Sequence, residues 1–292
     1  MTVINTNISS IQAQTAMRTT RASTEKAMER LSTGMKINFA GDDAAGLAIS
    51  SRMTSQIKGL NMAVKNAQDG ISLTQTAEGA LGEVQNMLQR MRELSLQAAS
   101  DTNSADDRSY LETELKALST EIDRVASTTI FNNKLLFSGS DFGTFSGNGT
   151  PTSPSTVTLK IQVGSNAGVS DGVEITLQET SAAALGVEVG TGKLELTDGA
   201  SSLTAVTAVD AALKNITNLR SSFGAIQNRL EHTVANLTNI ATNTELARSR
   251  IQDADYAQET SNMTRGQILQ QAGTAMLAQA NKMSQSVLSL LQ

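Results

Sequence analysis

The sequence predicts a mainly α-helical protein, in which the N- and C-terminal arms form a long antiparallel helical bundle or coiled coil with a small β-hairpin region inserted in the middle. Apolar residues recur in steps of three and four over most of the 292 residues, which is typical of helices. Both prolines, Pro151 and Pro154, lie in one short stretch, so proline interrupts the helical pattern nowhere else. Strict alternation of apolar and polar residues occurs just after that stretch.

Two domains are expected, each built from both arms of the chain. We predict a terminal coiled-coil domain from residues 1–45 plus 253–292, and a helical rod domain from residues 46–252. Near the N-terminus the helical pattern pauses, with Gly34 as a C-terminal stop and Asp42 or Asp43 as the N-cap of the next helix. The rod domain includes the hairpin and a variable loop at about 138–202.

Both ends of the chain are apolar and nearly free of charge. Met1–Met17 contains no charged residue, and Gln270–Gln292 contains only Lys282. Their apolar residues follow the seam of a coiled coil, which needs a partner helix to cover it. We therefore predict that the two ends form a self-assembly interface and also cover each other. The interface residues are Ile4, Ile8, Ile11, Leu269, Met276, Met283, Val287 and Leu290, and Ala272 and Ala280 continue the pattern.

Between these ends, three segments with helical spacing form the rod. The first begins near Ile57 and runs to about Met91. At 1.5 Å per residue, the predicted helix has a length on the order of 60 Å. Asp101–Asp107 carries loop and N-cap residues, and a second helix follows through Val125. A third begins near Val206 and reaches Ile240. Because a single apolar stripe cannot be buried alone, the two arms must pair.

The middle of the chain changes to a period of two. Val157, Leu159, Ile161 and Val163 alternate with polar residues, and "GVEITLQ" repeats the alternation from Val173 to Leu177. Gly, Asn and Asp between the two runs supply a turn, so this segment is predicted to form a β-hairpin. The stretch "GKLELTDG" is a candidate for one more strand.

Composition excludes several classes of function. Lys and Arg number 23 against 28 Asp and Glu, a net charge of -5, which argues against nucleic acid as a partner. There is no cysteine, and no stretch of eighteen apolar residues that would insert in a membrane. The N-terminus lacks the features of a secretory signal, so we expect a cytosolic protein or one exported without a cleaved signal peptide.

No catalytic, metal or cofactor site is predicted. His232 is the only histidine and is expected to lie on the face of a rod helix. Asp255 and Glu259 would share a helix face near Asp253, but the segment lacks the turn glycine of a calcium loop. We therefore expect solvated acidic surface or an inter-subunit contact there, and no enzymatic activity.

Several long motifs identify a family. "NTNISSIQAQ", "RLSTGMKINFAGDDAAGLAIS", "QDGISLTQTAEGAL", "GAIQNRLEHTVANL" and "RIQDADYAQETSNMTRGQILQQAGTAMLAQAN" closely resemble bacterial flagellin. The resemblance covers roughly residues 1–138 and 203–292, in the family's order. The middle departs from it, because family members often carry large outer domains there, whereas this chain has a short Gly/Ser/Thr-rich loop and a hairpin. The chain looks like a short flagellin.

The resemblance implies a structural subunit that polymerises into the hollow helical filament of the extracellular bacterial flagellum, for swimming. It implies that the terminal segments order on assembly. It also implies export through the flagellar type III apparatus, and partners in a flagellin chaperone, the filament cap and hook-associated proteins.

A second implication concerns innate immunity. "LQRMRELSLQ" resembles the stretch of monomeric flagellin that Toll-like receptors recognise. By this match, receptor recognition involves Gln89, Arg90, Leu94, Gln97 and Glu114.

Alternative functions explain the sequence less completely than flagellin does. A hook–filament junction protein shares flagellin-like ends and the export route, and is the main alternative; the residues of "RLSTGMKINFAGDDAAGLAIS" favour flagellin. A chemoreceptor-like signalling coiled coil explains the helical spacing but not the charge-free ends. A metalloprotease requires an H-E-x-x-H motif, which is absent. The sequence does not test a second role as an adhesin.

Overall fold

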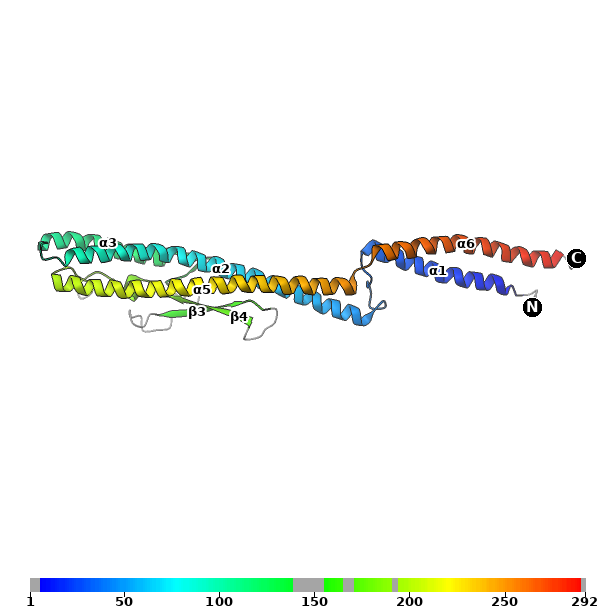
Figure 1. The fold of residues 1–292 in the computed structure, drawn as a ribbon, viewed down its shortest axis with the longest axis horizontal. Coiled ribbons are helices and arrows are strands. Elements are labelled where there is room, and N and C mark those ends of the chain that lie inside the picture. Colours follow the sequence, from blue (N-terminus) through cyan, green and yellow to red (C-terminus); the bar gives the residue numbers. More distant parts are fainter. Residues whose placement is uncertain (1–5, 139–154, 165–170, 191–193, 290–292) are drawn as a thin grey trace. The chain divides into compact units, whose positions relative to one another are not determined.

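The computed structural model describes residues 6–138, 155–164, 171–190 and 194–289, and within them it is mainly helical (Figure 1). Packing divides the chain into two compact units, Met1–Ile57 with Thr242–Gln292, here called the terminal unit, and Lys58–Ala241, here called the rod unit. The mainly helical fold class with a small hairpin is confirmed. The elements, in chain order, are α1 (Ile8–Thr33), α2 (Ala44–Ala98), α3 (Ala105–Thr128), β1 (Ile130–Phe131), β2 (Lys134–Leu135), β3 (Thr156–Gln162), β4 (Gly172–Gln178), α4 (Ala182–Leu185), α5 (Gly199–Gln252) and α6 (Tyr256–Ser289).

In the terminal unit, α1 and α6 lie side by side and run antiparallel (Figure 1). α1 ends at Thr33 because Gly34 adopts the left-handed conformation, with φ 71°, and its N–H bonds the carbonyl of Arg30. The break between α1 and α2 pairs with the break between α5 and α6. The N–H of Lys36 donates to the carbonyl of Gln252 at 2.6 Å, and the N–H of Ala254 donates to the carbonyl of Gly34 at 3.0 Å.

The adjacent aspartates before α2 have different roles. Asp43 Oδ1 accepts from the N–H of Gly46 at 2.9 Å, as an N-cap does. Asp42 Oδ1 lies 2.7 Å from Lys26 Nζ, and Oδ2 accepts from the N–H groups of Asn38 and Phe39. The hydrogen bond from Lys26, followed by those from Asn38 and Phe39, lowers the pKa of Asp42 to about 2. The loop before α2 is therefore held against α1.

In the rod unit, α2 and α5 pack through large apolar side chains. Leu81, Leu88 and Met91 of α2 and Ile216 and Phe223 of α5 are completely buried. α3 begins where the sequence predicted a new helix, after the Asp101–Asp107 loop. Ser104 Oγ accepts from the N–H of Asp107, and the Asp107 carboxylate accepts from the N–H of Ser104, which completes a capping box.

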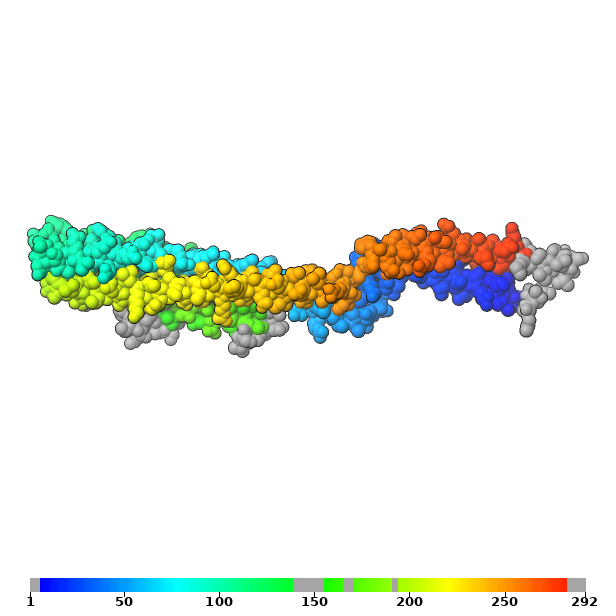
Figure 2. Space-filling view, in the orientation of Figure 1, coloured from blue at the N-terminus to red at the C-terminus, as the bar shows by residue number. Residues whose placement is uncertain are grey.

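The predicted hairpin is confirmed as antiparallel β3 and β4, with Val157 opposite Leu177 and Ile161 opposite Val173. Its apolar side packs on the helices of the rod unit, and Ile161 and Val173 share a core cluster with Leu230 of α5. Figure 2 shows the hairpin, in green, lying along α5, in yellow. The register follows from the alternation, because a shift by one residue would expose this face.

Two details of the middle region differ from the prediction. Among the described residues of "GKLELTDG", Leu194 forms a single bridge with Val189 and no strand, so that prediction was wrong. The short hairpin of β1 and β2 was not predicted; its turn residues Asn132 and Asn133 have φ of 48° and 62°. No helix in the described part of the chain is long and apolar enough to cross a membrane.

Candidate assembly interface

Small residues form the seam between α1 and α6. Ser10, Thr24 and Ala27 are the buried residues of α1, and Gly266 is buried on α6. A Cβ atom at Gly266 would lie 2.1 Å from Thr24 Oγ1, and one at Gly273 would lie 3.0 Å from Met17 Cγ. Glycine at 266 therefore allows α6 to approach Thr24 this closely, whereas at Gly273 the tight neighbour is the flexible side chain of Met17.

Polar contacts hold both ends of this seam. Arg30 Nη1 lies 2.8 Å from Glu259 Oε1, and the Glu259 side chain is only 10% exposed. At the other end, Asn7 Nδ2 donates to the carbonyl of Ala280 at 3.1 Å. The expectation of a solvated acidic surface was wrong for Glu259, because α1 covers its carboxylate and supplies a cation. Asp255 caps α6 by accepting from the N–H groups of Ala257 and Gln258.

Four of the predicted interface residues lie outside the seam, whereas Met17 of α1 packs against Gly273 within it. Ile8 and Ile11 are 51% and 53% exposed, and Leu269 and Met276 are 50% and 65% exposed. The prediction that the two apolar stripes cover each other was therefore wrong for these four residues. Ala280, which belongs to the predicted pattern, does contact α1, through the hydrogen bond from Asn7. In this unit, small residues suit close packing better than large ones do, which leaves the large side chains outside.

Four predicted interface residues have no described side chain. Ile4 and Leu290 lie outside the described residues. Met283 and Val287 belong to α6, but their side chains are outside the described part of the structure.

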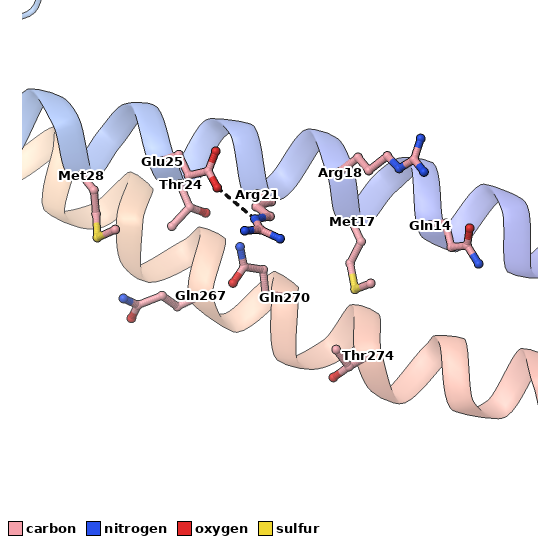
Figure 3. Close-up of a pocket in the computed structure, with 10 residues that line it drawn as sticks. All are labelled: Gln14, Met17, Arg18, Arg21, Thr24, Glu25, Met28, Gln267, Gln270 and Thr274. Atoms are coloured by element: carbon pink, nitrogen blue, oxygen red, sulfur yellow. Dashed lines mark hydrogen bonds and ion pairs between the residues drawn. The ribbon is translucent and has the colours of Figure 1, made fainter.

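A groove runs along one side of the α1–α6 pair (Figure 3). Its volume is about 600 Å³. Figure 3 shows Met17 and Met28 reaching from α1 toward α6, while Arg21 pairs with Glu25 at the edge, 2.9 Å apart. The residues that line it are Gln14, Met17, Arg18, Arg21, Thr24, Glu25, Met28, Gln267, Gln270 and Thr274.

In the rod unit, the predicted receptor-binding residues gather on α2 and α3. Gln89, Arg90, Gln97 and Glu114 are exposed. Arg90 donates to Glu114 Oε1 from Nε at 2.9 Å and to Glu93 Oε2 from Nη1 at 3.2 Å, and these bonds, first the one to Glu114, raise the pKa of Arg90. Leu94 differs, because it is only 1% exposed and belongs to the core. Its side chain is not available to a partner in this fold.

The described residues offer little else of chemical interest. His232 lies exposed on α5. No group of three or more His, Asp or Glu side chains in the described ranges is placed to hold a metal ion.

Family comparisons match both arms of this arrangement. The model of the bacterial flagellin N-terminal helical region matches residues 4–141, and that of the C-terminal helical region matches residues 206–291. The chain belongs to the bacterial flagellin family. It is a component of the flagellar filament, and hence of the extracellular flagellum.

Individual relatives agree with this assignment. The flagellin of Halalkalibacterium halodurans is 44% identical over 291 residues, covering 99% of this chain and 100% of the relative. The flagellar filament 33 kDa core protein of Treponema phagedenis is 44% identical over 292 residues, with the same coverage. A solved flagellar hook-associated protein from Vibrio parahaemolyticus has a TM-score of 0.52, covering 73% of this chain and 100% of that one; at 16% identity it shows a similar fold.

Sequence reasoning missed the inner seam of this flagellin. Its signal is a seven-residue spacing through Glu259, Gly266, Gly273 and Ala280. Such a heptad marks a helix-packing line even when its residues are small or polar. Apolar character alone pointed to a flanking line on α6, through Leu269 and Met276.

Proposed function

We propose that this flagellin polymerises through the outer surfaces of its α1–α6 pair to build the filament used for swimming. One observation carries the proposal. Ile8, Ile11, Leu269 and Met276 are each at least half exposed, although the helices bearing them are already paired. A second large apolar surface on a paired unit is typical of a protein–protein contact.

The apolar sequence pattern continues beyond the described side chains. Ile4, Met283, Val287 and Leu290 continue the apolar spacing toward both ends of the chain. We include them in the proposed interface on the sequence pattern. The role of the chain is then structural, with no catalytic step.

The partners follow from family membership. We propose export through the flagellar type III apparatus without a cleaved signal peptide, a chaperone that masks the C-terminal segment before export, and contacts with the filament cap and hook-associated proteins. An exposed apolar surface in the monomer needs such masking, because unpaired it promotes association too early.

We also propose recognition of the monomer by a Toll-like receptor through Gln89, Arg90, Gln97 and Glu114, with Leu94 acting by packing beneath them. The Arg90–Glu114 pair joins α2 to α3 and fixes the guanidinium on the exposed face. Arg90→Ala is expected to reduce receptor binding. Arg124→Ala, which removes an exposed ion pair within α3, is the matched control. Equal binding by both variants would refute this role.

A hook–filament junction role is the second candidate, since a hook-associated protein shares the fold. The two functions differ in the length of the polymer. The test is seeded polymerisation of the purified full-length chain, followed by electron microscopy, beside a chain trimmed by ~40 residues at each end, at the helix breaks. Long filaments from the full chain alone support the filament role. A full chain that stays monomeric with seeds supports the junction role, and filaments from the trimmed chain would contradict the proposed interface.

A further inference from the structure

We propose that neighbouring copies of this flagellin meet ridge to groove, so that Leu269 and Met276 of one copy enter the groove between α1 and α6 of the next. The inference rests on the proposed function, in which the outside of this helix pair is the assembly surface. It specifies which two faces of the α1–α6 pair contact each other in neighbouring copies.

The ridge and the groove lie on opposite sides of the same helix pair. Gly266 marks the direction from α6 to α1, because it packs against Thr24. At 3.6 residues per turn, Leu269 and Met276 lie about 60° and 80° to one side of that direction, whereas Gln270 and Thr274 lie about 40° and 80° to the other. Leu269 and Met276 are therefore aligned, about 10.5 Å apart along the helix.

The groove suits apolar side chains of this kind. Its floor includes the thioethers of Met17 and Met28, which adapt to the shape of an incoming side chain (Figure 3). Around the two methionines lie the amides of Gln14, Gln267 and Gln270 and the charged side chains of Arg18, Arg21 and Glu25. An incoming Leu or Met side chain would cover the thioethers, while these polar groups can turn toward water at the edge, as in the core and rim of protein interfaces.

The geometry of growth selects a second copy as the occupant. A ridge-to-ridge contact would be self-complementary and would stop at a dimer. A ridge-to-groove contact joins two different faces, so each added copy presents a new free ridge or groove and the array stays open. Of these two arrangements, only ridge to groove propagates into the filament that the family forms.

The natural absence of cysteine makes a direct test possible. One chain carries Met276→Cys on the ridge, and a second carries Gln14→Cys, Arg21→Cys or Gln267→Cys in the groove. The two are mixed in equal amounts, polymerised with wild-type seeds and oxidised, and disulfide-linked pairs are identified by non-reducing gel and mass spectrometry. Leu269→Cys serves as a second ridge position. Ala275→Cys, which lies about 180° from the seam, replaces the ridge cysteine in the control.

The proposal predicts links between ridge and at least one groove position, roughly tenfold above the Ala275→Cys control, because contact raises the effective concentration of the two thiols. Filaments in which ridge cysteines link only to each other, or to none of the three groove positions, would overturn it. Absence of filaments from the wild-type chain itself would refute the proposed function instead. Links of the groove cysteines to a cap or chaperone protein but not to a second copy would also overturn it.

Discussion

The two units of this flagellin use their large apolar residues in opposite ways. In the rod unit they are inside: all of the largest fully buried side chains among the described residues, including Phe223 and Leu88, belong to it. In the α1–α6 pair, small residues such as glycine, serine and threonine line the seam, and Ile8, Ile11, Leu269 and Met276 lie outside it. The rod unit therefore carries its own core, whereas the terminal pair leaves large apolar side chains exposed.

This difference has an energetic meaning. Burial of apolar area stabilises by about 25 cal/mol per Å², so a seam of Gly, Ser and Thr contributes little compared with one of Leu and Phe. In the proposed assembly, subunits added later would supply most of the stabilisation of the terminal pair. The rod unit is expected to fold without them.

The largest expected effect on stability distinguishes a buried apolar residue of the rod unit from an exposed one of the terminal pair. Phe223→Ala is expected to lower the free energy of unfolding by about 3–5 kcal/mol, because it opens a cavity in the core of the rod unit. Leu269→Ala is expected to change it by less than about 0.5 kcal/mol, since half of that side chain is already in water. Urea unfolding followed by circular dichroism measures both. Similar losses in the two variants would remove the distinction between the units.

The ion pair at the base of the terminal pair should have the next largest effect. Glu259→Gln leaves the Arg30 guanidinium largely covered without its anion, and is expected to destabilise the α1–α6 pair by about 1–3 kcal/mol. Hydrogen exchange of the α1 and α6 amides reports this loss separately from the rod. The exchanged pair, Arg30→Glu with Glu259→Arg, should recover part of the protection. Unchanged exchange in Glu259→Gln would mean that the pair does not stabilise the seam.

Two glycines of similar helical environment are expected to respond with opposite signs. Gly266→Ala pushes against Thr24 and should loosen the terminal pair, and removing the hydroxyl with Thr24→Ala should restore it in part. Gly224→Ala, where a Cβ meets nothing within 4 Å, should stabilise the rod by about 0.5–1 kcal/mol through helix propensity. Hydrogen exchange and urea unfolding measure the two effects. A harmless Gly266→Ala would show that the helices are not as close as the seam requires.

The smallest expected effect is the loss of stability of the loop before α2 at low pH. The pKa of Asp42 is lowered from 3.8 to about 2, so its contribution to stability is complete above pH 3.8 and disappears as the pH falls through 2. We expect the loop before α2 to stay closed at pH 3 in the wild type and to exchange faster in Asp42→Asn at the same pH. A carboxylate titration by NMR that gives Asp42 an ordinary pKa would contradict this arrangement.

Helix spacing and turn chemistry were readable in the sequence. The stop at Gly34, the start of a new helix after the Asp101–Asp107 loop and the hairpin of β3 and β4 follow from local rules of capping and alternation, and the structure confirms them. The flagellin motifs also anticipated the family correctly.

The inner seam was not readable in the same way. Leu269 and Met276 fit a coiled-coil line as well as Gly266 and Gly273 do, and the sequence alone favoured the larger residues. Which line meets α1 depends on how closely two helices approach, a tertiary property. Leu94 shows the same limit, since a motif match does not reveal that its side chain is buried while the other predicted receptor-binding residues are exposed.

The most direct test of the role of Leu269 and Met276 in assembly uses the double variant Leu269→Ala/Met276→Ala. The quantity measured is the concentration of monomer that remains at equilibrium with its filaments. After seeding, sedimentation separates polymer from monomer. We predict that residual monomer rises at least about tenfold over the wild type, which corresponds to about 1.4 kcal/mol per added subunit, while the urea midpoint stays the same. Met62→Ala, an exposed methionine on α2, is the control. Unchanged residual monomer in the double variant, or a lowered urea midpoint, would contradict the claim that these side chains serve assembly and not the fold.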